Sequence, residues 1–335
     1  MTIQANLYDI TIIGGGPVGL FGAFYAGMRQ AKTKIIESLG VLGGQPAHLY
    51  PEKKIFDIPA HYAVTGTDLT RDLMKQLERF DTTICLNEEA MQIEEIQLDD
   101  ATCFKITTTK AVHYSKSVII AIGNGAFRPR KLELPTAELY ENHSLHYFVS
   151  DPMRFKDQIV AICGGGDSAV DWALTLEPIA KKVYLIHRRP QFRAMEHSVK
   201  QLEQSSVEIL TPYIPVELHG TDQQLHRLKL QVPRQDEFKE ISIDHFIVSY
   251  GFVSSIGSIA EWGLEMQRQT IVTNASQQTN RAGIYAVGDV AQYDGKVRLI
   301  ANGFGEITTA VNHALNFLYP DRNKVPTHSS SLFTE

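Results

Sequence analysis

The residues of this 335-residue chain that are best suited to chemistry begin with three glycines, Gly14, Gly16 and Gly19, directly after an apolar run. In the pattern G-x-G-x-x-G the first glycine permits a tight turn, and the second admits a pyrophosphate to the backbone. The third lets a helix pack closely on a strand. Glu37 lies 23 residues after Gly14 at the end of another apolar run, where a carboxylate can accept hydrogen bonds from both ribose hydroxyls. This spacing predicts a dinucleotide site.

The same pattern occurs again near the middle of the chain, as Gly164, Gly166 and Ala169 after a second apolar strand. The next strand does not end in an acid here. An acid would repel a 2′-phosphate, whereas guanidinium groups can bind one through two parallel hydrogen bonds. The second site is therefore predicted to prefer NADPH over NADH, through the basic residues of the HRRPQFRA segment: His187, Arg188, Arg189 and Arg193.

A third signal is the dipeptide Gly288–Asp289 at the end of the apolar run IYAV. Gly-Asp is an ordinary turn sequence, so by itself this signal is weak. Together with the two glycine motifs, this dipeptide forms a recognisable set. The set predicts that Asp289 contacts the ribityl or phosphate part of a flavin held by the first site.

These residues need strands and helices to position them, and the periodicity of apolar residues predicts where those elements lie. Strand, turn and helix are expected in residues 8–26 and again in 159–174. A helix is expected over 66–80 and another over 305–318. Strands are expected over 91–97, 102–107, 111–122, 183–187, 228–232, 241–250 and 281–289.

Composition narrows the class of protein further. Hydrophobic residues make up 43% and charged residues 21%, which excludes a disordered chain. The net charge of −6 predicts no general attraction to nucleic acid or anionic membrane. The start lacks the pattern of a signal peptide and no apolar run is long enough to span a bilayer, so a soluble cytoplasmic protein is expected. The three cysteines show no zinc-like spacing, and no metal is predicted.

Together, GGGPVG, GGQ, GGGDSA, HRRPQFRA and AVGD resemble the two-dinucleotide-domain flavoprotein reductases of the thioredoxin reductase type. The resemblance extends from Tyr8 to about Leu318 and implies an α/β fold of two Rossmann-like domains. It implies an FAD-binding domain of residues 1–127 and 253–335, with an NADPH-binding domain of residues 128–252 inserted between the two parts.

A missing motif separates this chain from thioredoxin reductases, which carry C-x-x-C shortly before the second glycine motif. Here the only cysteine in that region is Cys163 itself, so no dithiol can relay electrons. The sequence instead resembles ferredoxin–NADP⁺ reductases built on this scaffold, which share the HLYPEKKIFDIPA segment and a C-terminal extension ending PTHSSSLFTE. That resemblance implies that Tyr50 and His328 stack on opposite faces of the flavin.

The expected cofactor contacts can be given as two sets. The FAD set combines the first motif with positions that match the family pattern: Gly14, Gly16, Pro17, Gly19, Glu37, Gln45, Tyr50, Ala90, Phe127, Asp289, His328 and Ser330. The NADPH set is Gly164, Gly166, Asp167, Ser168, Ala169, His187, Arg188, Arg189 and Arg193.

The implied activity is electron transfer between NADPH and ferredoxin or flavodoxin, through hydride transfer to FAD followed by one-electron steps. No acid–base residue is expected, because the cofactors carry the chemistry. The resemblance implies a homodimer. An acidic ferredoxin needs a basic docking surface, for which the candidates are Lys53, Lys54, Arg128, Arg130 and Lys131.

Three alternatives stay open at this point. An NAD(P)H oxidase or diaphorase that reduces oxygen or quinones shares every nucleotide motif. A disulfide reductase with a different dithiol is disfavoured by the cysteine positions. A redox-sensing binding module could keep the flavin without turnover, but the arginine cluster argues for use of a pyridine nucleotide.

Overall fold

The computed structural model describes residues 6–98, 101–149, 151–321 and 329–332, and the chain divides into two compact units. The first unit comprises residues 1–127 and 254–335, and the second comprises residues 128–253. The chain crosses between the units twice, in the paired strands β9 (Ala126–Pro129) and β18 (Phe252–Ser255). None of the helices in the described ranges is long and apolar enough to cross a membrane.

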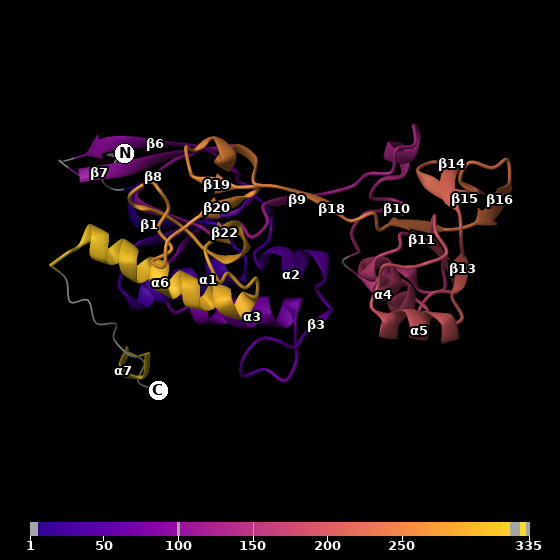
Figure 1. The fold of residues 1–335 in the computed structure, drawn as a ribbon, viewed down its shortest axis with the longest axis horizontal. Coiled ribbons are helices and arrows are strands. Elements are labelled where there is room, and N and C mark those ends of the chain that lie inside the picture. The colour runs from indigo at the N-terminus through magenta and orange to yellow at the C-terminus, as the bar shows by residue number, and fades with distance from the viewer. Residues whose placement is uncertain (1–5, 99–100, 150, 322–328, 333–335) are drawn as a thin grey trace. The chain divides into compact units, whose positions relative to one another are not determined.

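The first unit is built on a seven-stranded sheet in which β5-β2-β1-β8-β7-β6 lie in that order and β21 also pairs with β8 (Figure 1). The pairs β5–β2, β2–β1, β1–β8 and β8–β21 are parallel. The parallel strands are β1 (Leu7–Ile13), β2 (Thr33–Ile36), β5 (Thr83–Cys85), the far half of β8 (Val112–Ile120) and β21 (Ile284–Ala286).

The first residues of β8 pair antiparallel with β7 (Ala101–Thr108), and β7 in turn pairs antiparallel with β6 (Ala90–Leu98). The strands predicted over 91–97 and 102–107 are confirmed, and they pair antiparallel. Smaller pairings complete the unit: β3 (Lys54–Ile55) with β4 (Val64–Thr65), and β20 (Thr270–Val272) with β19 (Met266–Gln267) and β22 (Ala291–Gln292).

Helices α1 (Pro17–Met28), α3 (Gly66–Leu77) and α6 (Ile300–Leu318) pack together beside this sheet (Figure 1). The apolar positions of α3 recur at helical spacing, so Leu69, Leu73 and Leu77 face the core while its other side is polar. Two short helices, α2 (Gly44–Leu49) and α7 (Ser329–Leu332), and the 3₁₀ turns η4 (Gly257–Glu261) and η5 (Gly288–Val290) complete the first unit.

The second unit contains an all-parallel sheet of five strands in the order β10-β17-β11-β12-β13. These strands are β10 (Leu145–His146), β17 (His245–Val248), β11 (Ile159–Cys163), β12 (Lys182–Ile186) and β13 (Glu208–Leu210). Helices α4 (Asp167–Leu176) and α5 (Glu196–Gln204) and the 3₁₀ turns η2 (Ala137–Tyr140) and η3 (Pro152–Phe155) lie in the connections, and an antiparallel sheet is formed by β14 (Ile214–Thr221), β15 (Gln224–Gln231) and β16 (Phe238–Ser242).

Three predicted elements differ from the structure, and one is the strand expected over 281–289, of which only Ile284–Ala286 is a strand before the 3₁₀ turn η5. The strand expected over 241–250 is divided, because the chain leaves the antiparallel β16 and enters the parallel β17 at Asp244, whose carboxylate accepts the Ile159 N–H at 2.8 Å. The last long helix begins at Ile300 rather than at residue 305. Gly303, which resembles a helix breaker in sequence, lies where a Cβ would overlap the Val18 side chain of α1, so this glycine allows two helices to pack closely.

Candidate functional site: two dinucleotide cradles

The first glycine turn has the geometry of a phosphate-binding loop. Gly14 has φ +107°, and a Cβ there would lie 2.5 Å from the Ala121 carbonyl oxygen, so only glycine fits. A Cβ on Gly19 would overlap the Gly14 carbonyl oxygen. Gly16, in contrast, has its nearest neighbour at 3.8 Å and caps α1, whose first turn has no side-chain cap and no acid. Free N–H groups of a helix N-terminus beside open space fit a pyrophosphate.

Glu37 stands at the end of β2 and is only 6% exposed. Its Oε2 accepts the Gly15 N–H at 2.7 Å, and its Oε1 accepts the Leu39 N–H at 2.8 Å and the Ser38 hydroxyl at 3.2 Å. The carboxylate is thus fixed against the glycine turn. A carboxylate has about four acceptor positions, so capacity remains for a ribose hydroxyl.

The Gly43–Gln45 segment lies directly on the same turn. The Gly43 N–H donates to the Gly15 carbonyl oxygen at 2.8 Å, and a Cβ on Gly44 would lie 2.9 Å from the Gly16 Cα. The amide of Gln45 points at Gly123, where a Cβ would be 3.0 Å from Gln45 Nε2. The structure therefore brings Gln45 to the carboxyl ends of β1 and β8.

Asp289 and Tyr50 reach this region from distant parts of the sequence. Asn124, just after β8, donates from Nδ2 to the Asp289 carboxylate at 3.2 Å. Burial, together with the charges of Asp289 and Asp57, raises the pKa of Tyr50, so its ring stays uncharged near neutral pH. Asn124 is not among the residues predicted from the sequence, although its place in a glycine turn at the carboxyl end of a strand was the available signal.

A second residue that the sequence analysis missed holds the Gly288–Asp289 turn in place. Glu306 of α6 is 5% exposed and accepts the Gly288 N–H at 2.7 Å. Its other oxygen accepts the Tyr293 hydroxyl at 2.7 Å and forms an ion pair with the buried Lys296. An acid within the apolar face of a helix was the sequence signal for this role, because buried carboxylates need partners.

The other members of the FAD set are distributed as follows. Pro17 is buried at the first position of α1, and Ala90 is 4% exposed at the start of β6. Ser330 is exposed on α7, and within the described residues no hydrogen bond joins it to the glycine turn. Phe127 lies in β9, without a described side chain, and His328 lies outside the described residues.

The second glycine turn, at the end of β11, repeats the close backbone approach of the first, although Gly164 does not share the positive φ of Gly14. A Cβ on Gly164 would lie 2.5 Å from the Ser249 carbonyl oxygen, whereas one on Gly166 would meet nothing within 4 Å. Gly166 caps α4 without a side-chain hydrogen bond. Ala169 is fully buried, Ser168 is exposed, and the carboxylate of Asp167 accepts the Met195 N–H at 2.9 Å. This turn also fits a pyrophosphate.

The basic residues after β12 have two different environments. The His187 ring stacks on Phe192 with a centroid distance of 5.5 Å and covers Gly165. Burial and the three neighbouring arginines lower its pKa, so this ring is uncharged near neutral pH. The positive charge comes from the arginines, which are exposed and form no ion pair within the described residues: Arg188, Arg189 and Arg193. The Arg193 N–H donates to the Gly165 carbonyl oxygen, which anchors this loop to the glycine turn.

Comparison with known proteins agrees with this geometry. The family model described as pyridine nucleotide-disulphide oxidoreductase matches residues 8–314. Ferredoxin–NADP reductase 2 of Listeria innocua is 55% identical over 333 residues, covering 99% of this chain and 100% of that protein. The protein of the same name from Bacillus subtilis is 54% identical, with 99% of both chains covered. The chain belongs to the pyridine nucleotide-disulphide oxidoreductase family, and within it to the ferredoxin–NADP reductases.

Solved structures confirm the predicted fold of two Rossmann-like units. Thioredoxin reductase of Lactococcus lactis is 29% identical and gives a TM-score of 0.74, with 93% of this chain and 99% of that chain covered. Bacillithiol disulfide reductase Bdr of Staphylococcus aureus, at 19% identity and a TM-score of 0.70 over 92% of this chain and 98% of its own, shares the fold.

Proposed function

We propose that this chain is an FAD-dependent reductase that transfers electrons between NADPH and ferredoxin or flavodoxin. The observation that carries the proposal is the full-length likeness, at 55% identity, to proteins named ferredoxin–NADP reductase. The positions of the cysteines support it, because no two of Cys85, Cys103 and Cys163 form C-x-x-C. When bound, FAD takes a hydride from NADPH and passes electrons on singly.

The first unit is proposed to hold FAD. The N–H groups at the start of α1 bind the pyrophosphate, and Gly16 leaves room for it. Glu37 accepts hydrogen bonds from the ribose. Asp289, oriented by Asn124 and by the bond from Gly288 to Glu306, binds the ribityl chain, with Gln45 beside it.

The second unit is proposed to hold NADPH. The N-terminus of α4 binds its pyrophosphate, and the exposed guanidinium groups of Arg188, Arg189 and Arg193 bind the 2′-phosphate. His187 supports this site as a neutral, stacked ring that packs on Gly165. None of these residues needs to gain or lose a proton during hydride transfer.

Two aromatic residues are proposed to cover the flavin, following the family resemblance. Tyr50 is half-buried near Asp289, which supports a position against the isoalloxazine ring. For His328, the test is removal of the residues from Thr327 onward. We expect altered flavin absorption and turnover in the truncated protein, and unchanged behaviour would contradict a role for the tail.

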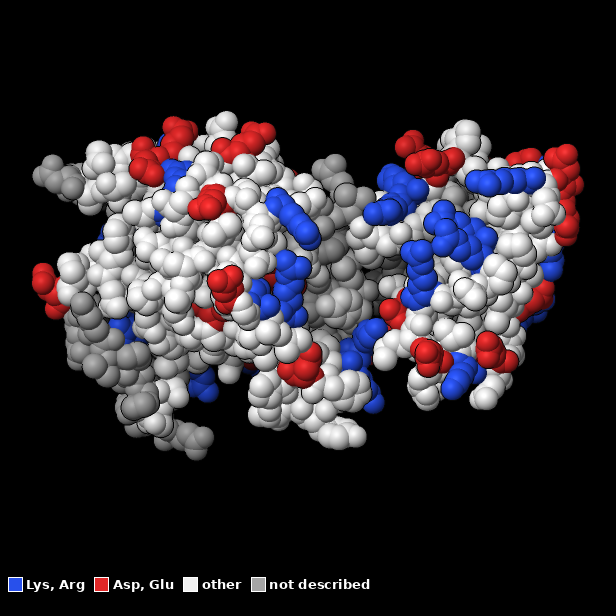
Figure 2. Space-filling view, in the orientation of Figure 1, with Lys and Arg blue, Asp and Glu red and all other residues white. Residues whose placement is uncertain are grey.

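The partner is proposed to dock through positive charge. Lys53, Lys54 and Arg130 are exposed, whereas Lys131 is engaged with Glu141 at 2.8 Å. Figure 2 shows further Lys and Arg side chains on the visible face of the second unit. Because salt screens exposed charges, the apparent affinity for ferredoxin should fall steeply as ionic strength rises. A flat salt response would contradict electrostatic docking.

Two further properties are part of the proposal. The resemblance to the family supports a homodimer, which sedimentation of the FAD-loaded protein would test. A reducing compartment such as the cytoplasm is supported by the three cysteines, which are not joined in disulfides and of which Cys103 and Cys163 are buried.

The decisive experiment is anaerobic stopped-flow absorbance of the FAD-loaded protein. NADPH should bleach the oxidised-flavin band rapidly, and an oxidised ferredoxin should then restore it rapidly. If only oxygen or quinones restore the band, the protein is an oxidase or diaphorase instead. If NADPH does not bleach the band, both readings are wrong and a binding role is favoured.

A further inference from the structure

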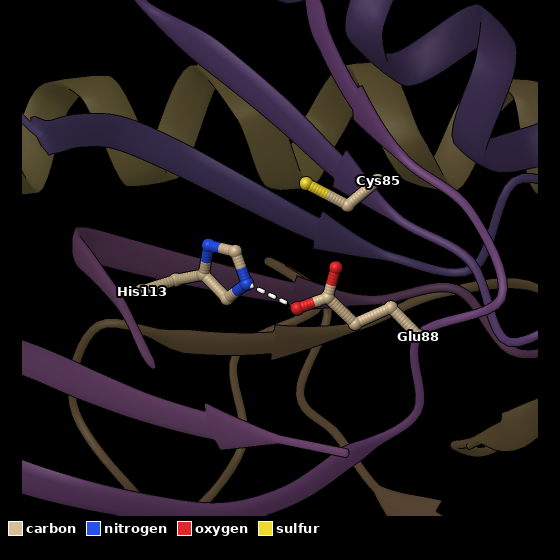
Figure 3. A group of neighbouring side chains, drawn as sticks. All are labelled: Cys85, Glu88 and His113. Atoms are coloured by element: carbon tan, nitrogen blue, oxygen red, sulfur yellow. Dashed lines mark hydrogen bonds and ion pairs between the residues drawn. The ribbon is translucent and has the colours of Figure 1, made fainter. Parts of the chain in front are cut away.

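A cluster of three potential metal ligands lies inside the first unit, next to the strand end that carries Glu37. Cys85 ends β5, Glu88 follows in the loop to β6, and His113 lies on β8 (Figure 3). One ligand atom of each residue lies within 4.8 Å of those of the other two. Thiolate, carboxylate and imidazole are the donor groups of zinc sites in proteins.

The geometry of the cluster is close to that of a metal site. His113 Nε2 and Glu88 Oε1 are 2.6 Å apart and share a hydrogen bond (Figure 3). Two ligands of a tetrahedral Zn²⁺, with bonds of about 2.0–2.1 Å, lie about 3.3 Å apart, so these two atoms would separate by less than about 1 Å. His113 is 8% and Glu88 6% exposed, while Cys85 is only half-buried and connects the cluster to solvent.

Lys34 competes with a metal ion for this site. Its Nζ lies 2.8 Å from His113 Nδ1, and an ammonium group can only donate. His113 Nδ1 therefore accepts, and the ring proton sits on Nε2, the nitrogen that faces Glu88. Lys34 Nζ also lies 4.1 Å from the centroid of the Tyr8 ring. This cation–π contact can hold the ammonium group when it leaves His113.

We propose that Cys85, Glu88 and His113 form a binding site for one Zn²⁺ ion, which displaces Lys34 from His113 when it binds. The Cys85 thiol releases its proton to solvent, the ring proton of His113 moves from Nε2 to Nδ1 by exchange with solvent, and a water molecule fills the fourth position. Spacing in the sequence does not reveal this site, because its ligands lie on or beside strands that meet only in the folded sheet.

The site is linked to the candidate ribose carboxylate through the main chain. The Glu37 N–H donates to the Cys85 carbonyl oxygen at 2.8 Å, and the Glu88 N–H donates to the Glu37 carbonyl oxygen at 2.9 Å. A metal that draws Cys85 and Glu88 together moves the neighbours of Glu37, so Zn²⁺ is expected to weaken FAD binding. This consequence rests on the proposed function, whereas metal binding itself does not.

The test is equilibrium dialysis of the tag-free, FAD-loaded full-length protein against Zn²⁺, with protein-bound metal measured directly. We expect one ion per chain, and at least a tenfold loss of affinity in Cys85→Ser. The matched control, Cys103→Ser, removes a buried thiol on β7 that lies outside the cluster and should leave the affinity unchanged.

The sharper variant is Lys34→Gln, which should bind Zn²⁺ more tightly by a factor on the order of ten or more. The substitution removes a positive charge beside the metal, and the amide oxygen can accept the Nδ1 proton of a metal-bound imidazole. Lys32→Gln is its control, because Lys32 is exposed and lies 4.6 Å from the same Tyr8 ring. Gain of affinity in Lys34→Gln alone cannot result from unfolding.

Equal Zn²⁺ affinity in the parent protein, Cys85→Ser and Lys34→Gln would overturn the proposal, as would no binding by any of them. Release of FAD is followed separately by the rise in free-flavin fluorescence during the titration. If Zn²⁺ binds but FAD stays bound, the link to Glu37 is wrong and the metal site stands. Failure of the proposed function would be seen in a different measurement. In that case NADPH would not reduce the flavin of the metal-free protein.

Discussion

Each of the two glycine turns of this molecule joins a strand to a helix, but the residues that follow the next strand have opposite charge in the two units. In the first unit β2 is followed directly by Glu37, a buried acceptor bonded to the turn itself. In the second unit β12 is followed directly by His187 and a loop of exposed arginines. A carboxylate there accepts bonds from ribose hydroxyls, whereas guanidinium groups attract a phosphate. We therefore propose that the residues after the strand, rather than the turn, determine which nucleotide each unit binds.

The turns also differ at the third position of the motif. Gly19 cannot carry a Cβ without overlapping the Gly14 carbonyl oxygen, but Ala169 carries one in a fully buried position. The start of the first helix thus lies too close to its glycine turn for an alanine at this position. This difference can be tested by exchanging the two residues.

The largest effect is expected from Gly19→Ala. The added methyl must push α1 away from the turn, so we expect loss of FAD retention and destabilisation of about 2–4 kcal/mol, in the range of overpacked positions. The reciprocal Ala169→Gly should cost only about 1 kcal/mol, because it merely loosens the start of α4. Bound flavin per chain and urea denaturation would measure both. Equal losses in the two variants would show that the turns do not differ.

The next largest effect is expected when alanine replaces Arg188, Arg189 and Arg193 together. Each lost charge-assisted hydrogen bond is worth about 1.5–3 kcal/mol, so the KM for NADPH should rise by about 100-fold or more. The KM for NADH should stay nearly constant, since NADH has no 2′-phosphate. Arg227→Ala removes an exposed arginine paired with Glu240 and serves as the control. A parallel rise for both nucleotides would contradict a role in selecting the phosphate.

A smaller effect is expected from Glu37→Gln. The amide keeps one acceptor oxygen but places a donor opposite the N–H of either Gly15 or Leu39, so FAD affinity should fall about tenfold, or about 1.4 kcal/mol. Glu78→Gln, an exposed exchange at the end of α3, should leave affinity unchanged. Titration of the apoprotein with FAD, followed by flavin fluorescence, gives both values. Unaltered affinity in Glu37→Gln would remove Glu37 from the site.

The smallest effect is a dependence of folding stability on pH that arises in the second unit. His146 is buried beside His245, and burial, His245 and Arg154 lower its pKa from 6.5 to about 3. Between these two pKa values, His146 is therefore protonated in the unfolded chain but neutral in the folded chain. Stability should fall as the pH drops below about 6.5, by up to about 1.4 kcal/mol per pH unit.

Denaturation of the protein at pH 7 and pH 5.5 would measure this dependence. His146→Gln should reduce it, and His143→Gln, an exposed neighbour, should not. If the two variants lose the same stability on acidification, a group other than His146 is responsible.

The sequence by itself determined the two nucleotide motifs, the acid at one strand end and the arginines at the other, and the lack of C-x-x-C. Each of these depends on spacing within a short segment, where a strand, a turn and a helix follow one another directly. Helices α2, α5 and α7 and most of the short strands were not predicted, whereas α1, α3, α4, α6 and most of the longer strands were predictable for the same reason. The start of α6 was not, because Gly303 serves close packing on α1 rather than a turn.

Only the tertiary structure decided which distant residues meet. Asn124 meets Asp289, Glu306 holds Gly288, and Lys34 binds His113 beside Cys85, although these partners lie far apart in sequence. Their contacts depend on which parallel strands are neighbours and on the register of each pair. Strand order is set by long-range burial of the whole sheet, and no local pattern of residues encodes it.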